Sequence, residues 1–270
     1  MKKAQVDREV ADGQRFEFGE NWKKFLHALN DERIAAAESS LKEMLEVDNL
    51  EGRTFLDIGC GSGLFSLAAR NLGAEVRSFD YDRSSVWCTA ELKNRYHKDD
   101  PQWIVEQGSV LDGAYLKSLG AFDIVYSWGV LHHTGEMWAA LDNVCSSVED
   151  GGLLFIAIYN QQPFASGYWS FVKRSYNSSR LMRPFWVLLH LLYPTIPSIL
   201  LKTLRGRKPP RGMTYWYDLL DWLGGYPFEV AAPRRIFDFY RARGFTLMQL
   251  ETVGGKHGCN EYVFRKSKAD

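Results

Sequence analysis

Residues 54–63 read Thr-Phe-Leu-Asp-Ile-Gly-Cys-Gly-Ser-Gly, and this stretch predicts the fold of the chain. Phe55, Leu56 and Ile58 form the apolar, partly β-branched run of a buried strand. The glycines that follow at alternate positions let the backbone turn sharply and approach a ligand closely, because they carry no Cβ. The stretch therefore predicts a strand that ends in a ligand-binding turn.

A helix is expected directly after the glycine turn. Apolar residues recur at helical spacing from Leu64 to Ala68, Ser62 is the expected N-cap, and Gly73 marks the end. A strand, a glycine turn and a helix start together expose backbone N–H donors. We therefore expect a polar ligand at this turn.

The acids near the turn restrict the kind of ligand. The loop reads G-x-G-x-G rather than the dinucleotide pattern G-x-G-x-x-G, and Asp57 precedes its first glycine. That carboxylate would repel a pyrophosphate but suits a ligand with an ammonium group. A second predicted strand, residues 75–79, ends at Asp80, at the spacing where an acid accepts ribose hydroxyls. Tyr81 follows and is expected against the adenine or ribose.

Asp57, the three glycines and Asp80 together resemble motif I and its following acid in class I S-adenosylmethionine-dependent methyltransferases. Residues 107–112, 122–133 and 151–159 resemble the family's third, fourth and fifth strands, in the same order. The resemblance covers roughly residues 50–160. It implies an α/β fold, a doubly wound Rossmann-like seven-stranded sheet with N-terminal helices and a helical insertion before the last helix. It also implies S-adenosylmethionine as cofactor and S-adenosylhomocysteine as product.

The resemblance places the cofactor-binding residues on the loops after the strands. They are Asp57, Gly59, Cys60, Gly61, Gly63, Asp80, Tyr81, Ser109, Val110, Ser127 and Trp128. The family commonly has an acid at the position of Ser109, so the usual carboxylate contact with the adenine amine is in question here.

Two adjacent histidines, His132 and His133, follow the predicted fourth strand and are the candidate catalytic residues. Methyl transfer to a hydroxyl requires removal of its proton, and histidine suits that role. A Leu-His-His run at this turn resembles small-molecule and sugar O-methyltransferases. Adjacent side chains point apart, so one histidine is expected to face the pocket, and a purely structural role for both stays open. Gly129 and His132 stand where ubiquinone-type O-methyltransferases carry acids, so metal assistance is not expected.

Composition excludes several classes of partner. Lys plus Arg and Asp plus Glu both total 33, so no general attraction to nucleic acid is expected. No Asp-Pro-Pro-Tyr or Asn-Pro-Pro-Tyr run follows the fourth strand, which argues against a DNA amino-methylating enzyme. The four cysteines are too widely spaced for a zinc site. The first residues lack the apolar core of a signal peptide, so a cytoplasmic location is expected.

Pattern changes along the chain divide it into four parts. Residues 1–50 are expected to form an N-terminal helical lid, with helices at 21–29 and 32–46 and an aromatic run at 16–22. Residues 51–159 alternate strands and helices and form the donor-binding core. Residues 160–230 are an insertion that builds the substrate pocket. Residues 231–270 supply a final helix, 233–243, and an antiparallel strand pair, 246–252 and 261–265.

The insertion is the most individual part of the chain. A helix is expected at residues 164–176, and the apolar stretch 185–201 is too short and proline-interrupted to span a membrane. It is expected to be a buried helical hairpin or a homodimer contact, with contact to a membrane surface left open. The basic loop 202–211 is either solvated surface or a site for an anionic amphiphile. The aromatic segment 215–229 is either a pocket wall or core packing, with its helix ending at the Gly224-Gly225 pair.

Taken together, these features predict a methyltransferase that acts on a small or amphiphilic acceptor, at oxygen rather than nitrogen. The acceptor classes considered are sugars, lipid-linked intermediates and secondary metabolites, including quinone precursors. Three alternatives stay open: a donor-binding sensor or scaffold, a small-molecule N-methyltransferase, and a nicotinamide-dependent oxidoreductase.

Overall fold

The computed structural model describes residues 29–192 and 215–268, together with Glu9, Asp12, Gln14, Arg15, Trp22 and Leu26. The strands are β1 Thr54–Ile58, β2 Glu75–Asp80, β3 Trp103–Gln107, β4 Phe122–Trp128, β5 Val148–Tyr159, β6 Phe245–Glu251 and β7 Cys259–Lys266. The helices are α3 Asp31–Leu45, α4 Leu64–Asn71, α5 Arg83–Tyr96, α6 Gly113–Leu119, α7 Met137–Asn143, α8 Ala165–Ser178, α9 Met182–His190, α11 Tyr215–Gly224 and α12 Pro233–Arg241.

The seven strands form one sheet in the order β3-β2-β1-β4-β5-β7-β6. β1 to β5 pair in parallel, whereas β7 runs antiparallel to both β5 and β6. The strand order reverses between β1 and β4, and this switch point is where doubly wound sheets bind ligands. The predicted doubly wound, seven-stranded Rossmann-like fold is therefore confirmed.

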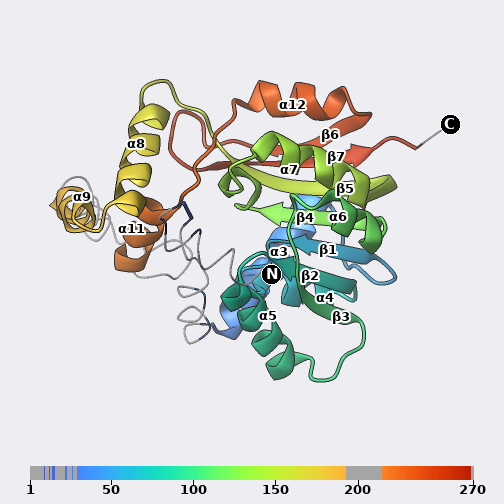
Figure 1. Cartoon of the computed structure of the whole chain (residues 1–270). Coiled ribbons are helices and arrows are strands. Elements are labelled where there is room, and N and C mark those ends of the chain that lie inside the picture. Colours follow the sequence, from blue (N-terminus) through green and yellow to red (C-terminus); the bar gives the residue numbers. More distant parts are fainter. Residues whose placement is uncertain are drawn as a thin grey trace.

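Helices cover both faces of the sheet (Figure 1). Buried side chains of α3, α4 and α5 pack on one face in a core that includes Leu41, Leu67 and Leu92. The other face is packed by α6, α7 and α12, where Ile236 and Tyr240 are fully buried. This double cover explains why successive side chains of β1 are all buried from Phe55 to Ile58, rather than alternating between buried and exposed.

Element boundaries differ from the predicted ones by a few residues. The final helix ends at Arg241 instead of 243, and the last strand begins at Cys259, two residues early. The predicted helix 32–46 is α3, which begins at Asp31 because the side chain of Asn30 caps it. Of the predicted lid, the structure describes residues 29–50, which include α3, and the separate N-terminal residues named above, so most of the aromatic run 16–22 and of the predicted helix 21–29 lies outside the described residues.

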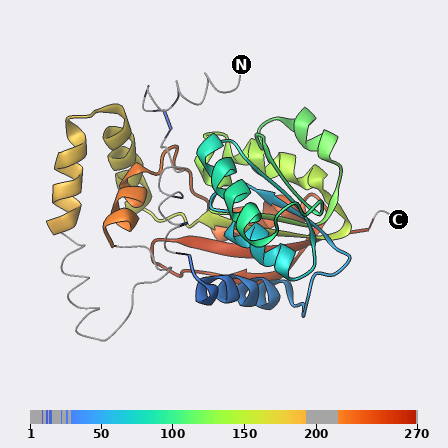
Figure 2. The ribbon, with the colours of Figure 1, turned by 90° about the horizontal axis from the view of Figure 1, so that it is seen from below.

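The insertion forms a small core of its own beside the sheet (Figure 2). Val172 and Tyr176 of α8, Trp186 of α9, and Leu219 and Leu223 of α11 are buried against one another. The predicted helix 164–176 corresponds to α8, and α11 ends at Gly224 as predicted. None of the helices in the described part of the chain is both long and apolar enough to cross a membrane.

The apolar stretch 185–201 is predicted to form a buried helical hairpin, and this prediction is wrong for the outer face of α9. α9 starts at Met182, and its apolar side chains at 185, 188 and 189 are exposed, because α8 and α11 cover only the opposite side of the helix. Residues 193–201 of that stretch and the basic loop 202–211 lie outside the described residues.

Candidate functional site

The carboxyl ends of the parallel strands bring the predicted site residues to one edge of the sheet. Asp57 lies at the end of β1 and Asp80 at the end of β2, which pairs with it in parallel. Ser127 and Tyr159 lie at the ends of β4 and β5 on the other side of β1. The switch point of the sheet therefore separates an acidic half from a half that carries the histidines.

The glycine turn requires glycine for reasons of backbone and space. Gly59, Gly61 and Gly63 have φ angles of 77°, 55° and 82°, in the left-handed region that L side chains rarely adopt. A Cβ on Gly59 would lie 2.4 Å from a methyl of Val130, and one on Gly63 would lie 2.9 Å from Thr89. The glycine turn is thus packed closely against Val130 and Thr89.

The backbone N–H groups of this turn already have partners within the protein. Those of Gly59 and Cys60 donate to the carbonyl of Phe79, and that of Gly63 donates to the carbonyl of Cys60. The Gly61 N–H donates to Asp80 Oδ2 at 3.0 Å. The expectation of an exposed set of N–H donors is therefore wrong for these four groups.

The N-cap of α4 also differs from the expected one. Gly63, not Ser62, occupies the N-cap position, and no side chain caps the helix there. The Ser62 hydroxyl lies 3.4 Å from the N–H of Leu64, which is a long contact for a hydrogen bond.

Asp57 is almost fully buried, at 2% exposure, and belongs to a directed chain of hydrogen bonds. Trp103 Nε1 donates to Ser78 Oγ at 3.0 Å, and Ser78 donates to Ser66 Oγ at 2.7 Å. Ser66 then donates to Asp57 Oδ2 at 2.5 Å. Burial raises the pKa of Asp57 to about 7, the Ser66 hydrogen bond lowers it, and the charge of Asp80 raises it.

Asp80 holds the glycine turn from the neighbouring strand. Its Oδ2 accepts from Gly61 and its Oδ1 accepts from the N–H of Asp82 at 2.8 Å. Burial raises its pKa to about 6, against the effect of these two backbone hydrogen bonds, which lower it. Each carboxylate oxygen has a second lone pair, so the group retains the capacity to accept hydroxyl donors.

Glu9 and Arg15 of the N-terminal segment lie across the carboxyl edge of the sheet. The sequence patterns did not indicate either residue as part of the site. Tyr81 Oη donates to Glu9 Oε1 at 3.1 Å, and Arg15 stacks 4.8 Å from the centre of the Tyr81 ring. Arg15 also pairs with Glu9 at 3.1 Å and donates to the carbonyl of His133 at 3.3 Å. Trp22 lies close to the glycine turn, 3.2 Å from where a Cβ on Gly61 would be. The N-terminal segment thus reaches both halves of the edge.

The other predicted cofactor residues make contacts within the protein. The Cys60 thiol is buried and accepts from Thr89 Oγ1 at 3.2 Å. Ser109 Oγ accepts from the N–H of Leu111, and Val110 is buried beside it. The fully buried Ser127 hydroxyl donates to the carbonyl of Ile58 at 3.0 Å.

Trp128 is half-buried at the end of β4, and the indole packs against the core on the α3, α4 and α5 side of the sheet. All the predicted cofactor residues except Asp80, Tyr81, Ser109 and Val110 therefore lie on or next to β1, β4 and the α4 turn.

His132 lies deepest at the carboxyl end of β4. It has no exposed surface, its Nδ1 accepts from the N–H of Tyr159 at 3.4 Å, and its ring lies 4.0 Å from the Tyr159 ring. Nε2 makes no regular hydrogen bond to any described residue, although the nearby Ala157 carbonyl raises the pKa. Burial and the charges of His133 and Lys173 outweigh that effect and hold the pKa of His132 well below its ordinary value.

His133 has the geometry expected of a proton acceptor. Its Nδ1 lies 2.5 Å from the carbonyl oxygen of Pro227. Because a carbonyl only accepts, Nδ1 carries the proton and Nε2 is the acceptor nitrogen. Burial, with the charge of Lys173, lowers the pKa of His133 to about 3, so the ring is neutral at physiological pH. The side chain keeps 8% exposure, whereas that of His132 has none.

Aromatic side chains of the insertion stand beside the histidines. The Tyr159 ring lies 5.6 Å from Trp222 and 5.3 Å from Phe228. Lys173 of α8 is fully buried, with Nζ 4.4 Å from the Trp222 ring and 4.9 Å from Phe228, and donates to the Trp222 carbonyl at the end of α11. Part of the segment 215–229 therefore lies beside the histidines and Tyr159, and Lys173 places a positive charge behind these rings.

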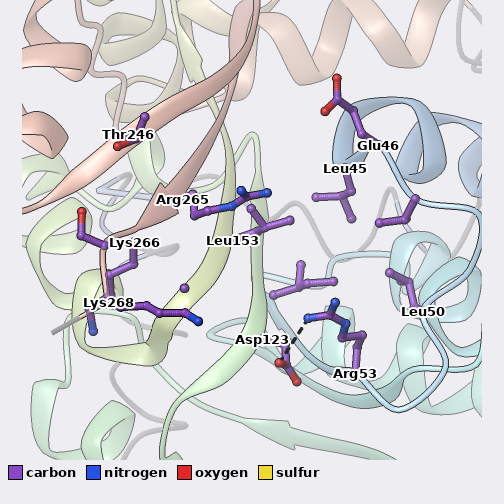
Figure 3. A pocket seen from close by; sticks show the side chains of 14 residues that line it. Leu45, Glu46, Leu50, Arg53, Asp123, Leu153, Thr246, Arg265, Lys266 and Lys268 are labelled. Carbon is purple, nitrogen blue, oxygen red and sulfur yellow. Dashed lines mark ion pairs between the residues drawn. The ribbon is translucent and has the colours of Figure 1, made fainter. Parts of the chain in front are cut away.

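A separate cavity of about 540 Å³ lies at the opposite edge of the sheet (Figure 3). Its lining includes Arg53, just before β1, and Asp123, which pair at 3.6 Å. It is remote from the motifs described above and does not belong to this site. Within the described ranges no group of three His, Cys, Asp or Glu side chains is placed to hold a metal ion.

Comparison with known proteins gives matches of two kinds. A family model described as a methyltransferase domain matches residues 27–223. The ubiquinone biosynthesis O-methyltransferase of Xanthomonas euvesicatoria is 30% identical over 162 residues, which are 60% of this chain and 63% of the relative. The aligned part thus spans less than two thirds of that relative.

Solved structures share the fold at low sequence identity. The magnesium protoporphyrin IX methyltransferase of Synechocystis, solved with bound S-adenosylhomocysteine, has a TM-score of 0.53 and 16% identity, covering 87% of this chain and 83% of that one. The cyclase SpnF has a TM-score of 0.56 and 12% identity, covering 87% and 81%. One architecture therefore carries more than one reaction, and the reaction must be argued from the site.

Proposed function

The chain belongs to the methyltransferase-domain family, and we propose that it binds S-adenosylmethionine at the carboxyl edge of its sheet and methylates an oxygen atom of a small or amphiphilic acceptor. The methyl donor supplies an electrophilic methyl group on a positively charged sulfur. The chain's own residues must hold that donor, orient the acceptor and take up its proton.

One observation carries the proposal: the glycine turn lies beside the buried carboxylate of Asp57 and the partly buried carboxylate of Asp80, and few of its N–H groups are left for an anion. Four of its N–H groups are bonded internally, so it is a poor cradle for a pyrophosphate. Asp57 and Asp80 have raised pKa values, which means that each ionised group is stabilised when a cation arrives. The methyl donor carries such charge, whereas a nicotinamide dinucleotide carries a pyrophosphate.

The residues present fit the donor in a defined way. Asp80 is proposed to accept the ribose hydroxyls on its remaining lone pairs, and Tyr81 to lie along the adenine or ribose. Asp57 is proposed to face the ammonium group through its second oxygen, Oδ1. Tyr81 is already oriented by Glu9 and Arg15, so this part of the site is preorganised.

His133 is the better candidate for general base. Its Nε2 is the acceptor nitrogen, and its side chain retains some exposure. A pKa of about 3 makes it a weak base in isolation. During transfer, however, the proton would reach His133 as the positive charge on sulfur disappears, so the total charge of the site would not rise. His132 is then proposed to position His133 and Tyr159.

The acceptor is proposed from the walls of the site and from the relatives. Tyr159, Trp222 and Phe228 offer flat apolar surfaces, which suit a ring or an isoprenoid-like body. The matched Xanthomonas protein is an O-methyltransferase of ubiquinone biosynthesis, which favours oxygen over nitrogen as the methylated atom. Sugars, lipid-linked intermediates and secondary metabolites remain the candidate acceptors.

Calorimetry with S-adenosylhomocysteine tests the donor site. The wild type should bind it, and Asp80→Ala should weaken binding at least about a hundredfold, because two hydrogen bonds to a charged carboxylate are lost. Asp48→Ala removes an exposed carboxylate away from the edge and should leave affinity unchanged. Equal affinity in Asp80→Ala and the wild type would overturn the site assignment.

Donor consumption separates the enzyme from a sensor or scaffold. With a phenolic or sugar acceptor, the wild type should convert S-adenosylmethionine to S-adenosylhomocysteine. Tight donor binding without turnover on any acceptor of these classes would instead favour a binding protein.

A further inference from the structure

The outer face of α9 carries an apolar stripe. Leu181, Phe185, Leu188 and Leu192 follow one another at intervals of four, three and four residues, which places them on one side of the helix. All four are exposed, with Leu181 at 88% and Leu188 at 58%. The opposite side of α9 holds the buried Trp186. The helix therefore has one apolar face in the insertion core and a second one facing outward.

The neighbouring helix extends this surface. α8 and α9 pack as an antiparallel hairpin, because Tyr168 Oη lies 3.0 Å from His190 Nε2 and Trp186 Nε1 donates to Ser175. Phe171, near the middle of α8, is 63% exposed. α9 lies at the side of the molecule farthest from β6 and β3 (Figure 1). We call this exposed set, Phe171, Leu181, Phe185, Leu188 and Leu192, the hairpin patch.

The charges along the two hairpin helices themselves have one sign. From Gly151 to Leu192 the sequence contains no Asp or Glu, although the whole chain has as many acids as bases. The same segment contains Arg174, Arg180 and Arg183, all exposed. Helices that carry apolar side chains together with arginines and no acids are typical of helices that lie in the interface of an anionic membrane.

We propose that the hairpin patch docks on the surface of an anionic phospholipid bilayer. The apolar stripe would enter the acyl boundary, and Arg174 and Arg180 would contact lipid phosphates. A second copy of this chain fits less well, because a two-fold contact through the patch would bring like-charged arginines together. Since α8 carries Lys173 on its inner side, docking would hold the aromatic wall of the site near the membrane surface.

Vesicle co-sedimentation tests the proposal on the full chain. Binding is expected to vesicles of phosphatidylcholine with about one third phosphatidylglycerol, to be weak on pure phosphatidylcholine, and to fall in high salt because of screening. Arg174→Gln with Arg180→Gln should lower the partition constant about thirtyfold, because each basic residue near such a surface contributes about 1 kcal/mol. Phe185→Ser with Leu188→Ser should lower it at least about tenfold on both vesicle types.

A matched control keeps the test specific. Ile104→Ser with Leu250→Ser removes two exposed apolar side chains from β3 and β6 and should bind vesicles like the wild type. Circular dichroism and binding of S-adenosylhomocysteine confirm that each variant is folded. Folded hairpin variants that bind vesicles as well as the wild type would overturn the proposal. So would a dimer, found by sedimentation, that Leu188→Ser dissociates while the wild type ignores vesicles. Neither result depends on methyl transfer.

Discussion

Replacing Asp57 with Asn should make the protein more stable and its donor binding weaker. The substitution keeps the shape of the side chain and an oxygen that accepts from Ser66, but it removes a buried negative charge. Burial raises the pKa of Asp57 from 3.8 to about 7. The folded state therefore binds the proton more tightly than the unfolded state, and stability falls as pH rises between these two values.

The size of the effect follows from the shift. A raised pKa of about 7 against 3.8 means that the ionised carboxylate destabilises the fold by on the order of 4 kcal/mol at pH 8. At about pH 5.5 Asp57 is still protonated in most folded molecules, and the same calculation gives a destabilisation of the fold of about 2 kcal/mol. Asp57→Asn should thus have a higher free energy of unfolding than the wild type at both pH values. The difference should be about 2 kcal/mol larger at pH 8 than at pH 5.5.

Urea unfolding at the two pH values measures that margin, with Asp48→Asn as a control at an exposed position. S-adenosylhomocysteine affinity, measured alongside, should fall about tenfold or more in Asp57→Asn, because a charge-assisted contact to the ammonium group is lost. A margin that is independent of pH, or a variant less stable than the wild type at pH 8, would refute the reasoning about this carboxylate.

The remaining predictions concern the histidines and the glycine turn. His133→Ala should lower kcat about a hundredfold or more while sparing donor affinity, and an unchanged kcat would remove His133 as base. His97→Ala, at the C-terminal end of α5 beside Asn71, should change neither kcat nor donor affinity. Because the pKa of His133 is about 3, kcat should show no loss from its protonation between about pH 6 and 9. Gly59→Ala should destabilise the fold by about 3 kcal/mol or more, since its Cβ would lie 2.4 Å from Val130. Gly254→Ala, also at positive φ but with open space around it, should lose only about 1 kcal/mol, and equal denaturant midpoints for the two would contradict the steric argument.

Local patterns predicted β1, the glycine turn and α4 because each depends on neighbours in the sequence. The apolar run of β1 reflects burial on both faces, and the glycines reflect the positive φ angles of the turn. The order of the seven strands followed instead from the resemblance to a family. No periodicity in this chain distinguishes it from other doubly wound orders.

The contacts that define the site were beyond such patterns because they join distant residues. Glu9 meets Tyr81 across 72 positions, and Arg15 meets His133 across 118. The carbonyl that takes up two N–H groups of the turn belongs to Phe79, on another strand. The contact of Ser66 with Asp57 could have been predicted from the sequence, because Ser66 lies in the first turn of a helix that packs beside Asp57.

The hydrogen-bond chain behind Asp57 also limits how this protein can diverge. Trp103, Ser78 and Ser66 each donate to the next member, so Ser66→Ala would deprive both Asp57 and the Ser78 hydroxyl of a partner. A buried polar group left unpaired costs about 1–3 kcal/mol, which is a large share of a typical domain's stability. Relatives that lose one member should therefore have changed the others as well, and positions 57, 66, 78 and 103 should be inherited as a set.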